Sequence, residues 1–528
     1  MSPARVLGAL LLLILSALLP GGTRELGATP RGKPAGGTVV VALPADLQGL
    51  DPGEVMDRTS WRVLSCVFET LVRPGPEPGQ VLPALAVSWK SSGNGREWVL
   101  NLRRDVRFHD GKPLTAAAAA SSLSRFSDPG PRRARATFFR CLLGGPTPVL
   151  RQVRALDSHT LQIVLREPMP GFLEILAHPP MAIVGPSMVL SEDGGAHPVG
   201  TGPFRFLERR SGQRVTLESN PQYWGGEPAL DHLVFTVVPQ ASARQRELLR
   251  GNADLALAVD LSAVDELKKL GTFRLAAAGG LNSWSLLMNC SRNPWSDIRT
   301  RLALQHALPR AALVRSLAGS RVAPATGVLS PRSWAHDETE KGYAWQPERA
   351  RRLLSRVRLP SSEPVWLLYP VESPVLADTD TLAREVAEGL TGVGLPVRPR
   401  ALPPAEFTDC LRRGAYDLAL QLEEKGMVDP DLDLYPAWSR ENRFPGGTNV
   451  SRFSSARLQD LLVMARSIRE PEHRLRLYGE IQQQLWRAVP TVPLAWALEV
   501  NAWRPELQGV TVDRLGIQDY SQAGLLRP

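Results

Sequence analysis

Runs of β-branched and other apolar residues alternate with helical segments along almost the whole chain. Thr38–Leu43 reads TVVVAL, which is typical of a buried strand. Residues 61–71 then place Val63, Val67 and Leu71 at helical spacing. This alternation predicts α/β lobes built around mixed sheets. Further strands are expected at residues 98–102, 106–108, 161–165, 215–217, 233–238, 284–288, 365–369 and 417–422, with the first two forming a hairpin, and further helices at 115–126, 244–249, 298–308, 309–318, 381–390, 455–467 and 472–488.

The size of the chain allows several domains. It has 528 residues, and at about 150 residues per domain this corresponds to two to four domains. Hydrophobic residues make up 43% and charged residues 22%, which is ordinary globular usage. We therefore expect sizeable buried cores.

The N-terminus predicts secretion. Residues 6–19 form an apolar run of fourteen, preceded by Arg5 and followed by small residues from Gly21 to Ala28. A run of this length is short for a membrane span but fits a signal peptide within residues 1–28, cleaved between 22 and 28; an uncleaved anchor is the alternative. No cysteine precedes Cys66, so a lipid anchor is not expected. A periplasmic protein follows.

Net charge and cysteine usage exclude several classes of site. Basic residues outnumber acidic ones by 62 to 53, but the arginines are scattered among acids, so we expect a solvated basic surface and no nucleic-acid partner. Cys66, Cys141, Cys290 and Cys410 lie far apart and lack metal-ligand spacing, so no metal centre or cofactor is expected. Zero to two disulfides are open, and the sequence does not choose among the pairings.

Catalytic motifs are missing from the sequence. There is no G-x-S-x-G, H-E-x-x-H or phosphate-loop motif. His109 and Asp110 are better explained by a hydrogen-bonded strand end and a tight turn than by general-base chemistry. The sequence therefore predicts no catalytic residues and a protein that is not an enzyme.

The acidic stretch Asp429-Pro430-Asp431-Leu432-Asp433 has two interpretations. Three carboxylates in five residues could hold a cation or the amine of a ligand. Alternatively, the stretch is a solvated turn in which Asp429 caps the next helix. The sequence alone leaves both open.

A series of short motifs runs in order along the chain and resembles the peptide-, dipeptide- and nickel-binding family of extracytoplasmic proteins of ABC importers. The series covers roughly residues 38–515, so coincidence is a poor explanation. Its members are Leu50-Asp51-Pro52, Phe68-Glu69-Thr70-Leu71, Pro83-Ala84-Leu85-Ala86-Val87-Ser88-Trp89, Phe108-His109-Asp110-Gly111, Gly200-Thr201-Gly202-Pro203-Phe204, Asn220 with Tyr223-Trp224, Gly251 with Ala253-Asp254, Asp297 to Ala303, and Pro490 to Pro493.

The resemblance implies a bilobal periplasmic-binding-protein fold that closes on its ligand about a hinge. Lobe I would combine residues 36–83, 199–278 and 494–528, lobe II would cover 279–493, and 84–198 would form a small inserted α/β domain. The implied function is capture of a peptide-like or other small cationic solute by a monomer, for delivery to a membrane permease. A sensor or chaperone with the same fold is the alternative.

The sequence departs from the family at the expected ligand anchor. In related oligopeptide binders, an aspartate three residues before an acidic residue and proline pairs with the peptide ammonium. Here Asp429 and Pro430 match that motif, but Gly426 stands at the aspartate position and Glu423 at a tryptophan position. We hypothesise that Glu423, Glu424 or Asp429 substitutes as the anchor.

Three further ligand-binding candidates come from position in the resemblance. Glu54 lies in the loop that touches ligand in the family. Trp284 and Trp438 could stack on a ligand, although packing in a core is the alternative for both.

Overall fold

The computed structural model describes residues 36–526 apart from 56, 78, 127–148, 189–196, 319–321, 360–363, 372–378, 424–428 and 444–446. The predicted signal peptide, Cys141, Glu424 and Gly426 therefore lie outside the described residues. Cys66, Cys290 and Cys410 are free thiols. Among the described residues, no helix is long and apolar enough to cross a membrane.

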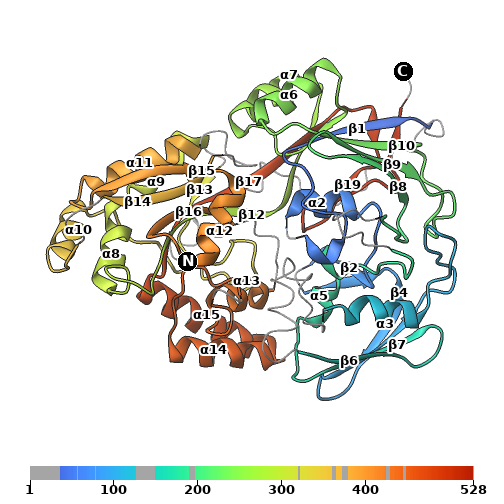
Figure 1. The fold of residues 1–528 in the computed structure, drawn as a ribbon, viewed down its shortest axis with the longest axis horizontal. Coiled ribbons are helices and arrows are strands. Elements are labelled where there is room, and N and C mark those ends of the chain that lie inside the picture. Colours follow the sequence, from blue (N-terminus) through green and yellow to red (C-terminus); the bar gives the residue numbers. More distant parts are fainter. Residues whose placement is uncertain are drawn as a thin grey trace, which may run out of the picture.

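One sheet of eleven strands runs through both halves of the molecule. Its order is β15-β14-β16-β12-β17-β11-β1-β10-β9-β8, with β13 paired to β17. β12 (Arg274–Met288) and β17 (Thr491–Trp503) pair antiparallel, and Figure 1 shows them crossing from one half to the other. Their pairing shifts register between Ala278 and Asn282, where the strands pass between the halves. This pair is the structural link about which the halves would move.

The right half of Figure 1, which we call lobe I, is built on β1. This strand pairs in parallel with β10 and β11, and β9 and β8 continue the sheet antiparallel. Val39, Val41 and Leu43 alternate into the core, as period-two packing requires. The elements are β1 (Thr38–Leu43), η1 (Pro52–Glu54), α2 (Arg58–Leu64), β2 (Val72–Pro74), β3 (Val81–Pro83), β8 (Phe204–Arg210), β9 (Arg214–Ser219), β10 (His232–Val237), α6 (Ala241–Arg250), β11 (Leu255–Ala256), η4 (Leu261–Ala263), α7 (Val264–Leu270), β18 (Leu507–Gln508), β19 (Thr511–Val512), β20 (Gln518–Asp519) and β21 (Gly524–Leu525).

A separate four-stranded sheet lies below lobe I in Figure 1, in the order β4-β5-β7-β6. All of its strands fall within residues 84–198, the segment assigned above to the inserted domain. The helix α3 contacts β6 and β7, and its N-cap is Thr115, as predicted: the Thr115 hydroxyl accepts a hydrogen bond from the Ala118 N–H. The elements are β4 (Ala86–Ser91), β5 (Glu97–Leu102), α3 (Ala116–Ser124), β6 (Leu150–Ala155), β7 (Thr160–Leu165), α5 (Phe172–Leu176) and η3 (Pro179–Met181).

The left half of Figure 1, lobe II, has two larger cores, besides a smaller cluster that includes Phe407 and Leu411. One lies between the sheet and helices such as α8, α10 and α11, and the other lies among α13, α14 and α15. The elements are α8 (Ile298–Ala307), α9 (Arg310–Ala318), β13 (Val322–Pro324), α10 (Pro347–Leu354), β14 (Val365–Pro370), α11 (Thr379–Thr391), β15 (Val397–Leu402), α12 (Pro404–Arg413), β16 (Leu418–Glu423), α13 (Pro430–Trp438), α14 (Ala456–Ser467) and α15 (Pro471–Ala488).

Two local expectations are wrong. The hairpin between residues 98–102 and 106–108 does not form, because β5 pairs with β4 and β7 instead. The helix expected over 61–71 ends at Leu64, because the carbonyls of Cys66 and Val67 accept hydrogen bonds from the Phe204 and Gly202 N–H groups. Tertiary hydrogen bonds override the local pattern in both places.

Candidate functional site

The crossing strands bring one of the predicted site residues to the lobe junction. Ser283 of β12 lies opposite Trp496 of β17 on one side and opposite Glu423 of β16 on the other. Glu423 is the last residue of its strand and is half-buried. The sheet register therefore fixes Glu423 beside the point where the chain passes between lobes.

A buried cluster of charges lies at the same junction. Arg58 and Arg62, one helical turn apart on α2, are each 2% exposed and both contact Glu499 of β17, which is 3% exposed. Arg62 Nη2 lies 2.5 Å from Oε1, and Arg58 Nη1 lies 3.3 Å from Oε2 and 3.4 Å from the Asn282 Oδ1. Burial alone would raise the pKa of the Glu499 carboxyl, but the two guanidiniums outweigh burial and lower it. The cluster joins α2 of lobe I to both crossing strands.

The lobes also touch away from the crossing strands. Gly171, at the start of α5, lies so close to Asp429 of lobe II that a Cβ on it would be 3.2 Å from Oδ2. Leu432 of α13 packs in the core of lobe I. Arg469 of lobe II donates from Nη1 to the Gly93 carbonyl of the inserted domain at 2.9 Å. These contacts describe a closed arrangement of the lobes.

A cavity of about 910 Å³ is lined mostly by residues of lobe I and the inserted domain. Ala277 of β12 and Arg332 of lobe II line it at the junction, and Tyr223 and Trp224 line it within lobe I. Cavities that hold small ligands have volumes of this order. None of the five predicted ligand-binding residues that the structure describes lines this cavity.

Glu69 lies on the wall of this cavity and contacts residues of two other motifs. Its carboxylate accepts hydrogen bonds from the Thr201 and Tyr223 hydroxyls and the Trp224 indole N–H at 2.8 to 3.2 Å. Burial raises the pKa of Glu69 to about 7, although these donors oppose the change. The contacts tie three motifs together, so these residues hold lobe I in shape.

His109 ties a further pair of motifs together. Its Nδ1 accepts from the Gly200 N–H at 3.3 Å, and its Nε2 lies 3.1 Å from the Gly202 carbonyl, which it reaches as a donor in the neutral ring. Desolvation lowers the pKa of His109 to about 4. The strand-end explanation given above for this histidine is therefore the one that its contacts support.

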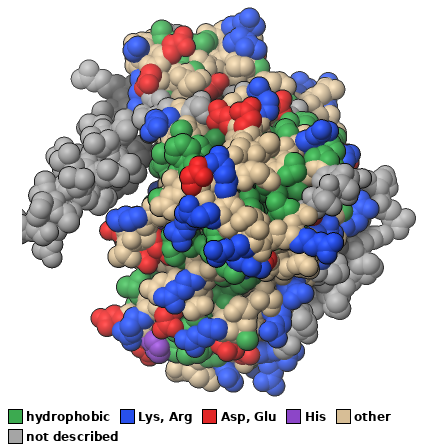
Figure 2. Space-filling model, turned by 90° about the vertical axis from the view of Figure 1, so that its left-hand side faces the viewer, with side chains coloured by type: hydrophobic (Ala, Val, Ile, Leu, Met, Phe, Trp, Pro, Cys, Tyr) green, Lys and Arg blue, Asp and Glu red, His purple; other side chains and the backbone are tan. Residues whose placement is uncertain are grey.

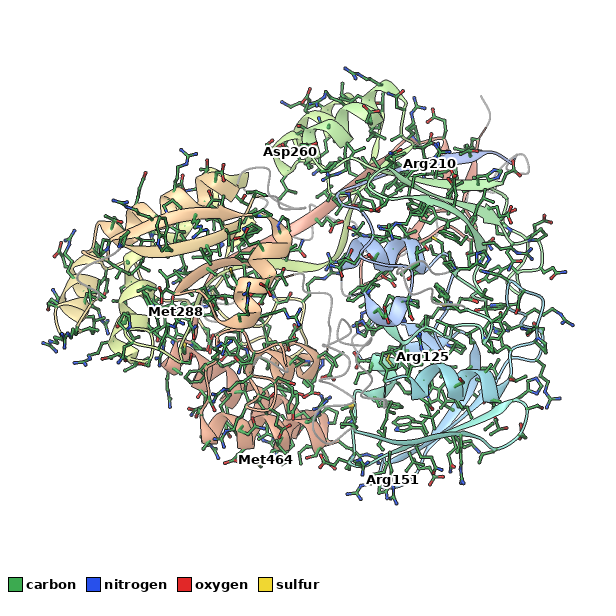
Figure 3. The ribbon with its side chains drawn as sticks, viewed as in Figure 1. Arg125, Arg151, Arg210, Asp260, Met288 and Met464 are labelled. Carbon is green, nitrogen blue, oxygen red and sulfur yellow. The ribbon has the colours of Figure 1, made fainter. Side chains whose placement is uncertain are left out.

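Asp51 of the first motif connects lobe I to the inserted domain. Its side chain caps η1 through the Gly53 N–H, and its Oδ2 lies 2.7 Å from Nη1 of Arg125, which is labelled in Figure 3 at the end of α3. The motif residues thus serve the scaffold throughout this region.

Asp429 has a structural role within lobe II. It is 1% exposed and caps α13 by accepting from the Asp431 N–H, and Arg474 Nη2 donates to both of its oxygens at 2.8 and 2.9 Å. Asp431 lies 3.3 Å from Arg466, and burial raises its pKa to about 6 although Arg466 opposes the change. The stretch is a helix cap, as one interpretation held, but it is buried and paired rather than solvated.

The remaining predicted residues are spread over several elements. Trp284 is fully buried in the core of lobe II and Trp438 is buried among α13, α14 and α15, positions that fit the core-packing alternative. Glu54 ends η1 in lobe I and is half-buried. Glu424 lies outside the described residues. Ligand binding by these residues stays a prediction.

Sequence reasoning missed the charged cluster at the junction. Arg58 and Arg62 are four residues apart on one short helix, a spacing that places both on one face. Their partner Glu499 is more than four hundred residues away in the chain. The spacing of the two arginines could have indicated a shared acidic partner. Nothing near them in the sequence identifies that partner as Glu499.

Comparison with known proteins gives a consistent picture. The family model described as "Bacterial extracellular solute-binding proteins, family 5 Middle" matches residues 80–444. The glutathione-binding protein GsiB of Escherichia coli is 27% identical over 481 residues, covering 89% of this chain and 91% of the relative.

Two solved structures share the fold. The dipeptide-binding protein of Pseudoalteromonas, solved with Met-Leu, has a TM-score of 0.83 at 20% identity and covers 93% of this chain and 100% of its own. DppA of Helicobacter pylori, solved with the peptide STSA, has a TM-score of 0.81 at 24% identity, with coverage of 93% and 99%.

Proposed function

Because this chain belongs to family 5 of the bacterial extracellular solute-binding proteins, we propose that it captures a short peptide or peptide-like solute between its lobes. The family serves ABC importers outside the cytoplasm, and its members are binding proteins and not enzymes. A membrane permease would receive the solute. The predicted signal peptide, the lack of a lipid anchor, the monomeric state and the absence of a nucleic-acid partner belong to the same proposal, as do the domain boundaries given above.

The observation that carries the proposal is the junction of the two lobes. Two continuous strands link the lobes on one side, and Gly171 and Arg469 reach the opposite lobe on the other. The half-buried Glu423 lies beside the linking strands at this junction, opposite Ser283 of β12. A solute held there would contact both lobes only when they are closed, which is how binding energy stabilises a closed state.

The relatives point to the chemical class of the solute. GsiB binds glutathione by name, and the two neighbouring structures hold a dipeptide and a tetrapeptide. Each of these ligands carries a free ammonium group. A carboxylate at the junction is therefore the feature to seek in this chain.

Glu423 is the candidate anchor that the structure favours. It is half-buried at the junction, whereas Asp429 is only 1% exposed and so is less accessible to a solute. Replacing a desolvated partner of a charged ligand group costs about 2 to 5 kcal/mol. Glu424 remains a second candidate.

Isothermal titration calorimetry of residues 29–528 with Met-Leu, Ser-Thr-Ser-Ala and glutathione tests the proposal. We expect at least one to bind, its N-acetylated form to bind more weakly, and Glu423→Gln to lower affinity by roughly thirtyfold. The exposed Glu406→Gln is the matched control and should leave affinity unchanged. Binding that Glu423→Gln does not alter would remove the anchor, and no binding by any of the three would remove the peptide class.

A further inference from the structure

One end of lobe II carries a concentrated basic segment. The last turns of α10 and the residues after it include Arg349, Arg351, Arg352, Arg356 and Arg358, all of them exposed, against a single acid, Glu348. Glu348 forms an ion pair with Arg351. The other four have no acidic side chain within 4.0 Å among the residues that the structure describes. Their charge is therefore turned to the surroundings of the protein.

An exposed tryptophan stands beside this segment. Trp345 lies two residues before the start of α10 and is 59% exposed, a large value for an indole ring. Tyr343 and Trp486 stack nearby with ring centroids 4.1 Å apart. A solvated basic helix has no need of an indole in water, so Trp345 is a second and independent observation.

The helix α10 lies along the surface of lobe II, with one side packed on the core and the other side exposed. Ala350 and Leu354 are buried in the lobe II core, where α10 packs on α8, while the arginines occupy the outer side. Arg351 also donates to the Gly392 carbonyl at 3.0 Å, which holds α10 against the end of α11. In Figure 1, α10 lies at the far left of the molecule, and Figure 2 views this end. Lys and Arg side chains spread across the middle of that face, with hydrophobic side chains between them.

We propose that this face, consisting of Trp345, Arg349, Arg352, Arg356 and Arg358, docks on the anionic headgroups of a phospholipid membrane. Basic side chains near a membrane surface are attracted to anionic lipid, and tryptophan is favoured at the depth of the headgroups. The location outside the cytoplasm excludes nucleic acid as the anion. Several exposed arginines that are spread along one segment suit a diffuse layer of headgroups better than one peptide or phosphate.

Docking of this face on the membrane would let the protein search for the permease along the membrane surface. A protein held loosely at the membrane meets a membrane protein by diffusion in two dimensions. Each arginine near an anionic surface strengthens binding by about fivefold, and salt weakens the attraction within a Debye length. Binding should therefore be reversible and should fall as ionic strength rises.

Vesicle flotation of residues 29–528 tests this proposal. We expect the protein to float with vesicles that contain phosphatidylglycerol at low salt, and not with vesicles of phosphatidylcholine alone. Replacing Arg349, Arg352, Arg356 and Arg358 together by Gln should abolish flotation, and Trp345→Ala should weaken it several-fold. The control replaces four exposed arginines of lobe I and the inserted domain, Arg104, Arg151, Arg246 and Arg250, by Gln.

The control separates a docking face from net charge alone. Equal loss of flotation in both fourfold variants, or no flotation of the wild-type protein, would overturn the proposal. Flotation only with vesicles that carry the permease would assign the face to a protein partner instead, and would also overturn it. Melting curves confirm folding of each variant. Peptide titration should be unchanged in the lobe II variant, so failure here is distinct from failure of solute capture.

Discussion

At the scale of single residues, the motif side chains hold lobe I together by hydrogen bonds across the chain. His109 bridges Gly200 and Gly202, and Glu69 collects three donors. These groups are half-buried and their pKa values are shifted, so their protonation is coupled to stability. The signature motifs of the sequence are explained by this scaffold and not by contact with ligand.

His109 makes stability depend on pH. Desolvation lowers its pKa in the folded protein from 6.5 to about 4, so the folded state binds fewer protons than the unfolded state below pH 6.5. The contribution of neutral His109 to the free energy of unfolding is present above pH 6.5. It is lost as the pH falls toward 4, the pKa of His109 in the folded protein. Between about pH 6.5 and pH 5, the wild-type protein should lose about 2 kcal/mol more stability than His109→Gln in denaturant unfolding. The exposed His197→Gln serves as control, and equal pH dependence in all three proteins would show that His109 is not the group responsible.

The Asp429–Arg474 pair belongs to the fold of lobe II. Removing one partner of a buried pair leaves the other charge without compensation, which costs about 3 to 5 kcal/mol. Arg474→Met and Asp429→Asn should each destabilise the protein by amounts of this order. The double variant should cost clearly less than their sum, as a double-mutant cycle measures. Additive costs would mean that the two side chains act independently.

Residue-level prediction from sequence succeeded where the signal is local. Thr115 was recognisable as a cap because a cap and its helix are adjacent in the chain, and for Asp429 the cap was one of two interpretations left open. The cluster of Arg58, Arg62 and Glu499 could not be found, because its acid comes from a strand at the other end of the sequence. Whether Trp284 lies in a cleft or in a core could not be predicted from the residue type, since tryptophan occurs in both. The structure places it in a core.

At the scale of elements, close backbone contact controls where α2 ends. The Gly202 N–H donates to the Val67 carbonyl at 2.9 Å, and a Cβ on Gly202 would lie 2.5 Å from the Cys66 carbonyl oxygen. A Cβ on Gly200 would likewise collide with the Val67 carbonyl. The predicted helix over 61–71 is cut short because its last carbonyls serve this contact.

Gly200→Ala and Gly479→Ala should change stability in opposite directions. At Gly200 the added methyl group meets backbone, so we expect a loss of more than about 2 kcal/mol. Gly479 lies inside α15 with nothing within 4 Å of its added Cβ, so alanine there should stabilise by about 0.5 to 1 kcal/mol. Thermal unfolding measures both. A tolerated Gly200→Ala would contradict the close packing described here.

At the scale of the whole molecule, the alternating pattern predicted the α/β class correctly, because buried strands and amphipathic helices have distinct periods. It could not predict that both lobes share one continuous sheet. Strand order depends on pairings such as β12 with β16 and β17, which join segments far apart in the chain. The arrangement at the junction is settled by that pairing.

Closure of the lobes should weaken as pH rises. Burial and the neighbouring Asp429 raise the pKa of Glu174 to about 7 in the closed structure, although Arg514 and Arg474 oppose the change. A group whose pKa is raised on closure stabilises the closed state at low pH, and that contribution is lost as pH rises through about 7. The affinity for the peptide found by calorimetry should fall between about pH 4.5 and pH 7, and Glu174→Gln should flatten this dependence. A wild-type slope that persists in Glu174→Gln would assign it to another group.

The central claim is that solute is held between lobes that close on it. Small-angle X-ray scattering of the protein with and without a saturating peptide measures this most directly. The account predicts a smaller radius of gyration with the peptide bound, because the closed state is then populated. If calorimetry shows that the protein is saturated with peptide and the radius of gyration is unchanged, the lobes do not close on the solute. The peptide would then bind to one lobe alone.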